Sequence, residues 1–350
     1  MKKILLLALC WACLASLAHA GSIGGMPFVL YSSTYGMEYG VIGRARDQLG
    51  RKESLTLSSD WLENGGHVNH FLVSFPDQDL RHGKAFGLAL DLKGSFGNYL
   101  NERYYGLGSD SPSAGYTLFD DRYGYVNIIL SRAVRKNLTL STGLLIAGYS
   151  FSNIRQGTDP LTPQIQDNCR QYYAGALGLA VDNRDNSADP RQGNYFLADF
   201  ALGIAGAGSP ARYAKFSVDL RRYAAPFHPD QVLAGRVKLV QLSGDVIPLY
   251  EYATLGGRDT LRGYSLDRFR DRGAMLLNLE YRFPLIWSLS GVVFYDAGKV
   301  APRLPDIGSN DWASDYGAGL RINFGNVIVR GDVGKSDEGT NFYFFYDHAF

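Results

Sequence analysis

The sequence predicts an all-β protein, a transmembrane antiparallel β-barrel of about sixteen strands. Segments of roughly ten residues alternate between apolar and polar side chains, which is the pattern of strands that line a polar lumen and face lipid. The chain of 350 residues contains 41 glycines, 23 tyrosines and 19 phenylalanines, a composition typical of outer-membrane barrels. No run of about eighteen apolar residues follows residue 20, so we expect no membrane-spanning helix.

Residues 1–20 have the features of a cleaved secretory signal peptide. Lys2 and Lys3 precede an apolar stretch, and Ala18-His19-Ala20 forms a small-residue cleavage site. A retained membrane anchor is the alternative, but the stretch is too short and lacks a stop-transfer flank. We therefore expect export across the inner membrane, with residues 21–350 forming the barrel and no soluble domain in front of it.

Cysteine usage adds little. Cys10 and Cys13 lie in the signal peptide, which leaves Cys169 as the single thiol of the mature chain. A lone thiol forms no intrachain disulfide, and we interpret Cys169 as a loop or strand-end residue without a chemical role.

The first half of the barrel begins after Pro27 and is punctuated by turn residues. Residues 84–95 show the alternation most clearly, with Phe86, Leu88, Leu90 and Leu92 on one face. A loop containing residues 101–108 is expected next. The strands predicted for this half are 28–35, 37–46, 54–61, 67–75, 84–95, 123–132, 138–151 and 171–184.

The second half opens after a turn rich in Asp, Asn, Pro and Gly at residues 182–193, and each of these residue types favours chain reversal. Its last strand ends the chain on Phe350. An even number of strands allows the last to pair with the first and removes both sheet edges. The strands predicted for this half are 195–207, 212–223, 233–242, 274–283, 292–300, 318–324, 326–333 and 341–350.

Several strands place basic side chains opposite their apolar face. Lys215 and Arg221 alternate with apolar residues in one strand, and Arg236 and Lys238 do so in the next. We expect these four to line a wet, charged lumen. A soluble periplasmic β-sandwich is the alternative fold, but it does not account for so many charges opposite continuous apolar faces.

A long loop and the two strands after it carry the candidate site. Gly256 to Tyr264 contains paired glycines and alternating charges, and we expect its backbone to turn sharply at Gly263. Arg262 offers a planar fork of five donors. Glu280 and Asp296 are acids on the polar face of the two strands that follow. An arginine enclosed in a barrel needs carboxylates as partners, although a solvated loop charge is the alternative for Arg262.

At this point the chain resembles the BamA/TamA-type bacterial surface antigen superfamily over essentially the whole barrel. Arg262-Gly263-Tyr264, Leu279 to Pro284, Phe294 to Gly298, Tyr104 to Gly108 and the turn 182–193 carry the resemblance. The resemblance implies that the long loop after strand 11 folds back into the lumen, with Arg262 paired to Glu280 and Asp296. We expect this loop to act as a lock that includes Gly263 and Tyr264.

Two departures from the family pattern affect the expected partners. Members that insert or export proteins carry periplasmic POTRA domains, and we expect none in this chain, so a separate periplasmic partner would supply their role. Phe344, Tyr346 and Phe350 fit the family's assembly signal, although Asp347 stands where glycine is common. We still expect recognition by the barrel-assembly machinery of the cell.

No catalytic or cofactor site is expected. A barrel lipase needs a serine and a histidine together at the lipid rim, and no such spacing is evident around His67, His70, His82, His228 or His348. His67 and His70 lie three apart on a strand and face opposite sides, so they make a poor metal pair. The net charge of +1 suggests no nucleic-acid partner. We expect a protein that is not an enzyme and binds no cofactor or metal.

Two functions remain. The first, which the resemblance implies, is participation in outer-membrane biogenesis, through insertion or translocation of a polypeptide or lipid cargo at a weak junction between the first and last strands. The second is a passive anion-favouring pore or structural surface antigen, with the four basic lumenal residues as its lining. In both cases the barrel contacts outer-membrane lipid.

Overall fold

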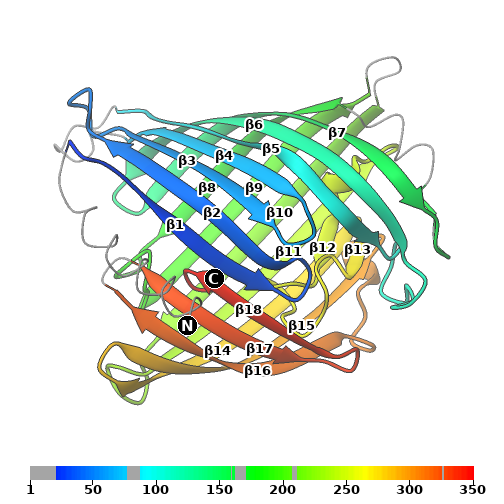
Figure 1. Cartoon of the computed structure of the whole chain (residues 1–350). Coiled ribbons are helices and arrows are strands. Elements are labelled where there is room, and N and C mark those ends of the chain that lie inside the picture. Colours follow the sequence, from blue (N-terminus) through cyan, green and yellow to red (C-terminus); the bar gives the residue numbers. More distant parts are fainter. Residues whose placement is uncertain (1–20, 77–86, 159, 162–170, 207–210, 325–326) are drawn as a thin grey trace.

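A computed structural model describes residues 21–350 except 77–86, 159, 162–170, 207–210 and 325–326. The predicted signal peptide, residues 1–20, and Cys169 lie outside the described residues. Sixteen strands form one closed antiparallel barrel, which confirms the predicted fold (Figure 1). The strands that build it are β1 Ile23–Ser32, β2 Gly36–Arg46, β3 Ser54–Leu62, β4 His67–Phe75, β5 Ala89–Tyr104, β6 Thr117–Arg135, β7 Leu138–Arg155, β8 Gln171–Asp182, β9 Gly193–Ala205, β10 Ala211–Ala224, β11 Val232–Gly244, β14 Gly273–Ile286, β15 Leu289–Ala301, β16 Ala313–Asn323, β17 Ile328–Lys335 and β18 Thr340–Tyr346.

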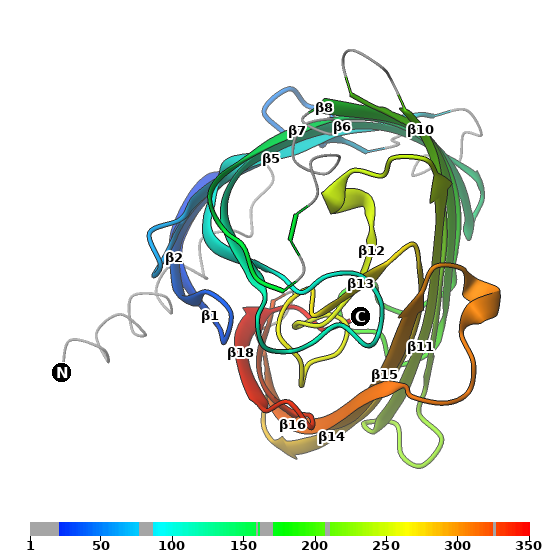
Figure 2. The same ribbon diagram turned by 90° about the vertical axis from the view of Figure 1, so that its right-hand side faces the viewer.

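The segment between β11 and β14 is the longest described connection and lies inside the barrel. It contains a short 3-10 turn, Leu249–Glu251, and a small two-stranded sheet of β12, Ala253–Leu255, and β13, Phe269–Asp271. In the view along the barrel, this segment crosses the lumen (Figure 2). The predicted in-folded loop after strand 11 is therefore present. Within the described residues, no helix is long and apolar enough to cross a membrane.

The two ends of the barrel can be assigned from loop length. Outer-membrane barrels have short periplasmic turns and longer extracellular loops. The connection 245–272 and the β5–β6 loop, residues 105–116, lie at one end, whereas the β6–β7 turn at Lys136-Asn137 and the start of β1 lie at the other. We therefore place the in-folded loop on the extracellular side and both ends of the barrel domain on the periplasmic side.

Each strand presents one face to the lumen and one to the outside, as the alternation predicted. In β14, Asn278, Glu280 and Arg282 are buried inside, whereas Leu279 is 42% exposed on the outer face. The lumen also contains an apolar cluster that packs the in-folded segment, including Leu249, Leu255, Leu261, Leu276 and Tyr172. The segment therefore occupies a place in a packed core and does not hang freely in water.

Several strand boundaries differ from the sequence prediction, among them those of β6, which starts at Thr117, and β16, which starts at Ala313. β1 starts at Ile23, so Pro27 lies inside a strand and not before it. Proline has no N–H to donate to a neighbouring strand. It is tolerated at residue 27 because β18 is in register with β1 only at Tyr31 and Ser32, so β2 is the only described barrel strand in register with Pro27. β5 runs on to Tyr104, through residues predicted to be loop, with a register shift between Tyr99 and Glu102.

The last strand is shorter than predicted. β18 ends at Tyr346, and Asp347 adopts the left-handed backbone conformation with φ of 71°. This turn directs residues 348–350 inward, and Phe350 is buried against Tyr223, Val232 and Ala234 of β10 and β11. Phe350 therefore lies inside the barrel and not on its lipid-facing surface.

The junction that closes the barrel is short. β1 and β18 are in register at Tyr31↔Phe344 and Ser32↔Tyr343, whereas β1 and β2 are in register from Ile23 to Ser32. Two further hydrogen bonds join the strands at Ser33. The backbone N–H of Ser33 donates to the carbonyl of Phe342 at 3.1 Å, and the side-chain oxygen of Ser33 accepts from the N–H of Phe342 at 2.8 Å. Of the described barrel strands, only β2 is thus in register with residues 23–30 of β1.

Candidate functional site

The candidate site is built around Arg262, which the in-folded segment carries to the inner wall formed by β14 to β17. Its side chain is only 1% exposed. The Nε and Nη2 atoms donate to the two oxygens of Asp296 at 2.8 and 2.9 Å, and Nη1 donates to Oε1 of Glu280 at 2.6 Å. The structure thus brings together the arginine and both acids that the sequence singled out.

An aromatic ring completes the arginine site. The guanidinium lies over the ring of Phe294, 3.4 Å from its centroid, and Phe294 precedes Asp296 on β15 by two residues. An arginine fork can form the paired bonds to a carboxylate and stack on a ring at once, which an ammonium group cannot. This geometry explains why the position holds arginine and not lysine.

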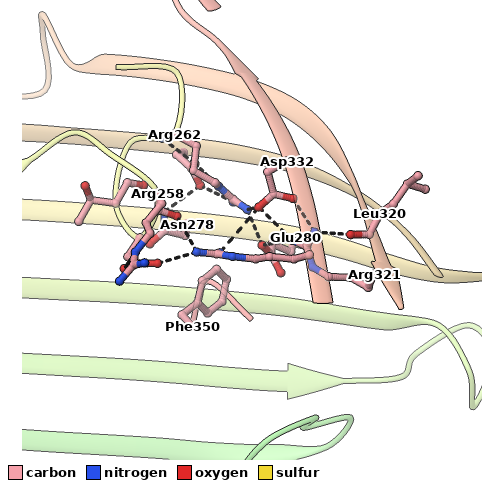
Figure 3. A network of polar contacts seen from close by, with 12 residues as sticks. Arg258, Arg262, Asn278, Glu280, Leu320, Arg321, Asp332 and Phe350 are labelled. Atoms are coloured by element: carbon pink, nitrogen blue, oxygen red, sulfur yellow. Dashed lines mark hydrogen bonds and ion pairs between the residues drawn. The ribbon is translucent and has the colours of Figure 1, made fainter. Parts of the chain in front are cut away.

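Further buried side chains connect the site to the loop backbone and to β16 and β17 (Figure 3). Asn278 donates to the carbonyl of Thr260 at 2.7 Å and to Asp296 at 2.8 Å. Asp332 on β17 lies 3.6 Å from Nη1 of Arg262 and also pairs with Arg321. These residues were not predicted from the sequence, although their alternation with outward-facing apolar residues placed them on the lumenal face.

The network brings opposite charges together throughout. Glu280 contacts Arg262, and it also contacts Arg282 at 2.8 Å and Arg321 at 3.7 Å. Burial by itself lowers the pKa of the Arg262 guanidinium, but the carboxylates of Asp296 and Glu280 outweigh burial and raise the pKa. Arg262 therefore stays charged, and removal of one member leaves its partners with an uncompensated buried charge.

The backbone turns at Gly263 as expected, because the N–H of Tyr264 donates to the carbonyl of Leu261 at 3.1 Å. The φ of Gly263 lies outside the left-handed range, unlike that of Gly256 at 117° and Gly257 at 95°, so the space around Gly263, and not its backbone conformation, requires glycine. A Cβ built on Gly263 would lie 2.5 Å from Cβ of Asp315 and 2.8 Å from the backbone of Lys335. Only glycine lets the loop backbone approach β16 and β17 this closely.

Tyr264 fixes the loop to the extracellular end of β17 and β18. Its hydroxyl donates to Asp337 at 2.7 Å, and its carbonyl accepts from Tyr343 at 3.3 Å. The neighbouring carbonyl of Gly263 accepts from Ser336 at 2.8 Å. The loop therefore holds the last hairpin of the barrel next to the short β1–β18 junction.

A second set of contacts joins loops at the extracellular end of the lumen. Arg268 donates to the hydroxyl and carbonyl oxygens of Ser111, at 3.0 and 2.6 Å, and pairs with Glu338 at 2.7 Å. Ser111 belongs to the β5–β6 loop and Glu338 to the β17–β18 turn. One arginine thus joins the in-folded segment to loops on two sides of the barrel.

The three residues of the expected assembly signal do not share one environment. Phe344 is 36% exposed on the outer face, whereas Phe350 is 6% exposed and lies in the lumen. Tyr346 ends β18. The signal itself stays a prediction, but its last residue is not available at the lipid-facing surface in this conformation.

Three of the four basic residues expected in the lumen are paired with acids. Arg221 and Arg236 both contact Asp219, at 2.8 and 2.7 Å, and Lys215 contacts Glu251 at 3.1 Å. The carboxylates of Asp219 and Glu251 therefore offset part of the charge of these three cations at close range.

The two histidines of β4 lie on opposite faces. His70 points inward and contacts Asp60 at 3.0 Å, whereas Nε2 of His67 lies 2.9 Å from the hydroxyl of Ser59 on the outer face. The expectation that no histidine lies with a serine at the lipid rim is therefore wrong for His67. The serine comes from a neighbouring strand, so spacing along the sequence did not reveal it. Among the described residues, no group of three or more His, Cys, Asp or Glu could hold a metal ion.

The comparison with protein families identifies the fold family. The family model described as the Omp85 superfamily domain matches residues 59–350. The chain belongs to the Omp85 superfamily. The predicted resemblance to BamA-type barrels is thereby confirmed, and the Omp85 assignment implies the outer membrane of bacteria. No curated protein matches this Omp85 chain.

Solved structures agree with this Omp85 fold. BamA from Haemophilus ducreyi, crystallised without POTRA domains 1–3, matches with a TM-score of 0.66 and 17% identity over 93% of this chain and 70% of that one. CdiB from Acinetobacter baumannii matches with a TM-score of 0.58 and 14% identity, and CdiB from Escherichia coli with 0.62 and 14%. These matches cover 92% and 94% of this chain but only 59% and 63% of the CdiB chains.

Proposed function

We propose that this Omp85 barrel inserts polypeptides into the outer membrane or moves them across it, and that the cargo engages the exposed edge of β1. The observation that carries the proposal is the closing junction, in which β1 and β18 are in register at only two positions. Every other pair of neighbouring barrel strands is in register over at least seven residues.

An unpaired strand edge within a membrane is unstable on its own. Backbone N–H and C=O groups find no water in the bilayer core, and each one left without a partner costs several kcal/mol. Along residues 23–30 of β1, β2 is the only described barrel strand in register, so no second barrel strand is paired with this segment. A strand of an incoming polypeptide would satisfy these groups by pairing with them.

The Arg262 loop supports this function by keeping the rest of the barrel in one shape. It is anchored to β14, β15 and β17 through the acids and to the β17–β18 turn through Tyr264. The strands next to the junction are therefore held by contacts inside the lumen, and the junction itself does not need extensive pairing to keep β18 in place.

A disulfide across the junction tests the proposal. Ser32→Cys with Tyr343→Cys, in a Cys169→Ala background, joins two directly paired residues on the lumenal face. We expect the oxidised variant to lower the amount of outer-membrane or exported cargo protein in cells, and reductant to restore it. The matched control, Ala318→Cys with Val333→Cys, bridges the fully paired β16 and β17.

Loss of function in the control as well would show that cross-linking itself is harmful. Normal cargo levels with a fully formed Ser32–Tyr343 disulfide would contradict the proposal. The passive-pore alternative gains no support from the paired basic residues, and it stays a prediction that conductance measurements can test.

A further inference from the structure

Three polar side chains stand on the outer surface of β3 and β4, where lipid-facing residues are normally apolar. Ser59 shares its face of β3 with Leu57 and Trp61, which are 51% and 48% exposed. The register places Ser59 opposite Asn69 and Trp61 opposite His67 on β4. All of them therefore face outward, and polar groups in this position need partners or a role.

The three side chains form one hydrogen-bonded set. The hydroxyl oxygen of Ser59 lies 2.9 Å from Nε2 of His67 and 2.9 Å from the side-chain oxygen of Asn69. A serine hydroxyl has a single proton. With the amide of Asn69 turned, which interchanges its oxygen and nitrogen, Ser59 accepts from Asn69 and donates to His67. This arrangement places a nucleophile within hydrogen-bond reach of a base.

The base has a fixed orientation. The ring of His67 stacks on the indole of Trp61, with centroids 5.2 Å apart and the planes inclined by 21°. His67 is the first residue of β4, directly after the extracellular turn from β3. Its Nε2 atom is therefore held toward Ser59 by an aromatic neighbour and by the start of a strand.

The depth of the set in the membrane matches that of lipid esters. Tyr39 and Trp61 are outward-facing aromatic residues near the extracellular end of β2 and β3, and such residues mark the membrane interface. Ser59 lies two residues further toward the bilayer on the same face of β3. The ester bonds of membrane lipids lie at this boundary between head groups and acyl chains.

A groove leads from Ser59 along the outer surface of β1 to β5. Its volume is about 800 Å³, and apolar side chains line most of it. The groove is open at Gly43, where a Cβ would meet no atom within 4 Å. Its outward-facing lining comprises Gly25, Pro27, Val41, Gly43, Leu57, Phe71 and Phe96, with Ser59 and Asn69. An acyl chain is the occupant that an apolar groove on the lipid-facing side of a barrel fits.

We propose that Ser59 and His67 form a lipid-facing site that hydrolyses the ester of an acyl chain lying in this groove. The Ser59 oxygen adds to the ester carbonyl carbon while His67 takes the hydroxyl proton. The bond to the lipid alcohol then breaks, and His67 returns the proton to the departing oxygen. Water next attacks the acyl-serine, its proton passing through His67 back to Ser59, and a free fatty acid leaves. The net reaction is the hydrolysis of the lipid ester by water to a fatty acid and the lipid alcohol.

The reacting residues Ser59 and His67 belong neither to the Arg262 loop nor to the closing junction, although the groove shares Gly25 and Pro27 with the segment of β1 assigned to the cargo. A purely structural set would satisfy its own hydrogen bonds and react with nothing. Reactivity of the Ser59 hydroxyl separates the two cases, because an isolated serine hydroxyl does not react with a fluorophosphonate probe and a base-activated one does.

The experiment uses the full mature barrel in vesicles of dioleoyl phosphatidylcholine. We expect a fluorophosphonate probe to label Ser59, located by peptide mass spectrometry, and the vesicles to release oleic acid above the protein-free background. Ser59→Ala abolishes the label, and both Ser59→Ala and His67→Gln lower the release about 100-fold or more. Ser58→Ala, the neighbouring serine on the lumenal face, leaves label and release unchanged.

Folding of each variant is checked by heat-modifiable gel mobility. Absence of label on Ser59 of the wild-type barrel overturns the proposal without any variant. Release that persists in Ser59→Ala overturns it as well, and so does release that His67→Gln leaves at the wild-type rate.

Discussion

Arg262 and Asp296 are joined by two parallel hydrogen bonds, of 2.8 and 2.9 Å, between groups that are almost fully buried. The pair links a loop that starts at the extracellular end of the barrel to a strand in its wall. Removal of the guanidinium would leave Asp296 and Glu280 as buried charges that have lost their shared partner.

We therefore expect Arg262→Ala to destabilise the barrel by about 3–5 kcal/mol. The measurement is the midpoint of the heat-modifiable shift in gel mobility, together with protease sensitivity of residues 245–272. Arg258→Ala is the matched control, because Arg258 belongs to the same loop and borders the lumenal cavity, but its ion pair with Asp259 is about half exposed, and we expect a loss of only about 0–1 kcal/mol. Equal behaviour of the two variants would mean that the buried pair does not fix the loop.

Gly263→Ala tests the close approach of the loop to the wall. The added Cβ would lie 2.5 Å from Cβ of Asp315, so either the loop or β16 must move. We expect a loss of about 1–3 kcal/mol, measured in the same thermal assay. Gly331→Ala on β17 is the control, since a Cβ there meets no atom within 4 Å. A wild-type midpoint for Gly263→Ala would show that the packing at this point is loose.

The C-terminal tail should respond to pH. His348 contacts Asp189 of the β8–β9 turn at 3.1 Å, and burial lowers the pKa of His348 to about 4. The ordinary histidine pKa of about 6.5 applies once the tail is released, so release takes up a proton between these values. The docked tail is therefore fully favoured above about pH 6.5 and loses up to about 3 kcal/mol as the pH falls toward 4.

Trimming by a carboxypeptidase that is active at both pH 7 and pH 5 measures this release. We expect removal of Phe350 to be faster at pH 5, and His348→Gln to abolish the difference after correction for the activity of the peptidase. The charged groups around His348 are Asp189, Glu280, Arg282 and Arg321. Equal rates at the two pH values in the wild type would show that the tail does not titrate.

Conductance in planar bilayers should reflect the plugged lumen. The in-folded segment crosses the lumen and meets the β5–β6 loop at Arg268 and Ser111. We expect small, unstable openings in the wild type and larger ones in Arg268→Ala, which removes the contacts of the in-folded segment with Ser111 and Glu338. Large, steady, anion-selective openings of the wild type would instead favour the pore.

Much of the fold was predictable because alternation of side chains is a local property. In residues 274–283, every second residue is apolar, and a strand in a barrel wall is the structure that satisfies this pattern. The boundaries of β1, β5 and β18 were not predictable, since they depend on neighbouring strands. Pro27 is accepted in β1 only because β18 does not pair with it there, and Asp347 ends β18 where an aromatic pattern continues.

The sequence by itself determined the strand faces, the long loop and the choice of Arg262, Glu280 and Asp296 as partners, because a buried arginine requires carboxylates. Only the tertiary structure decided that Gly263 is needed for space, that Phe350 lies in the lumen, and that Ser59 meets His67 on the outer surface. These three relationships join residues on different strands or loops, and strand register, which barrel closure sets, brings such residues together.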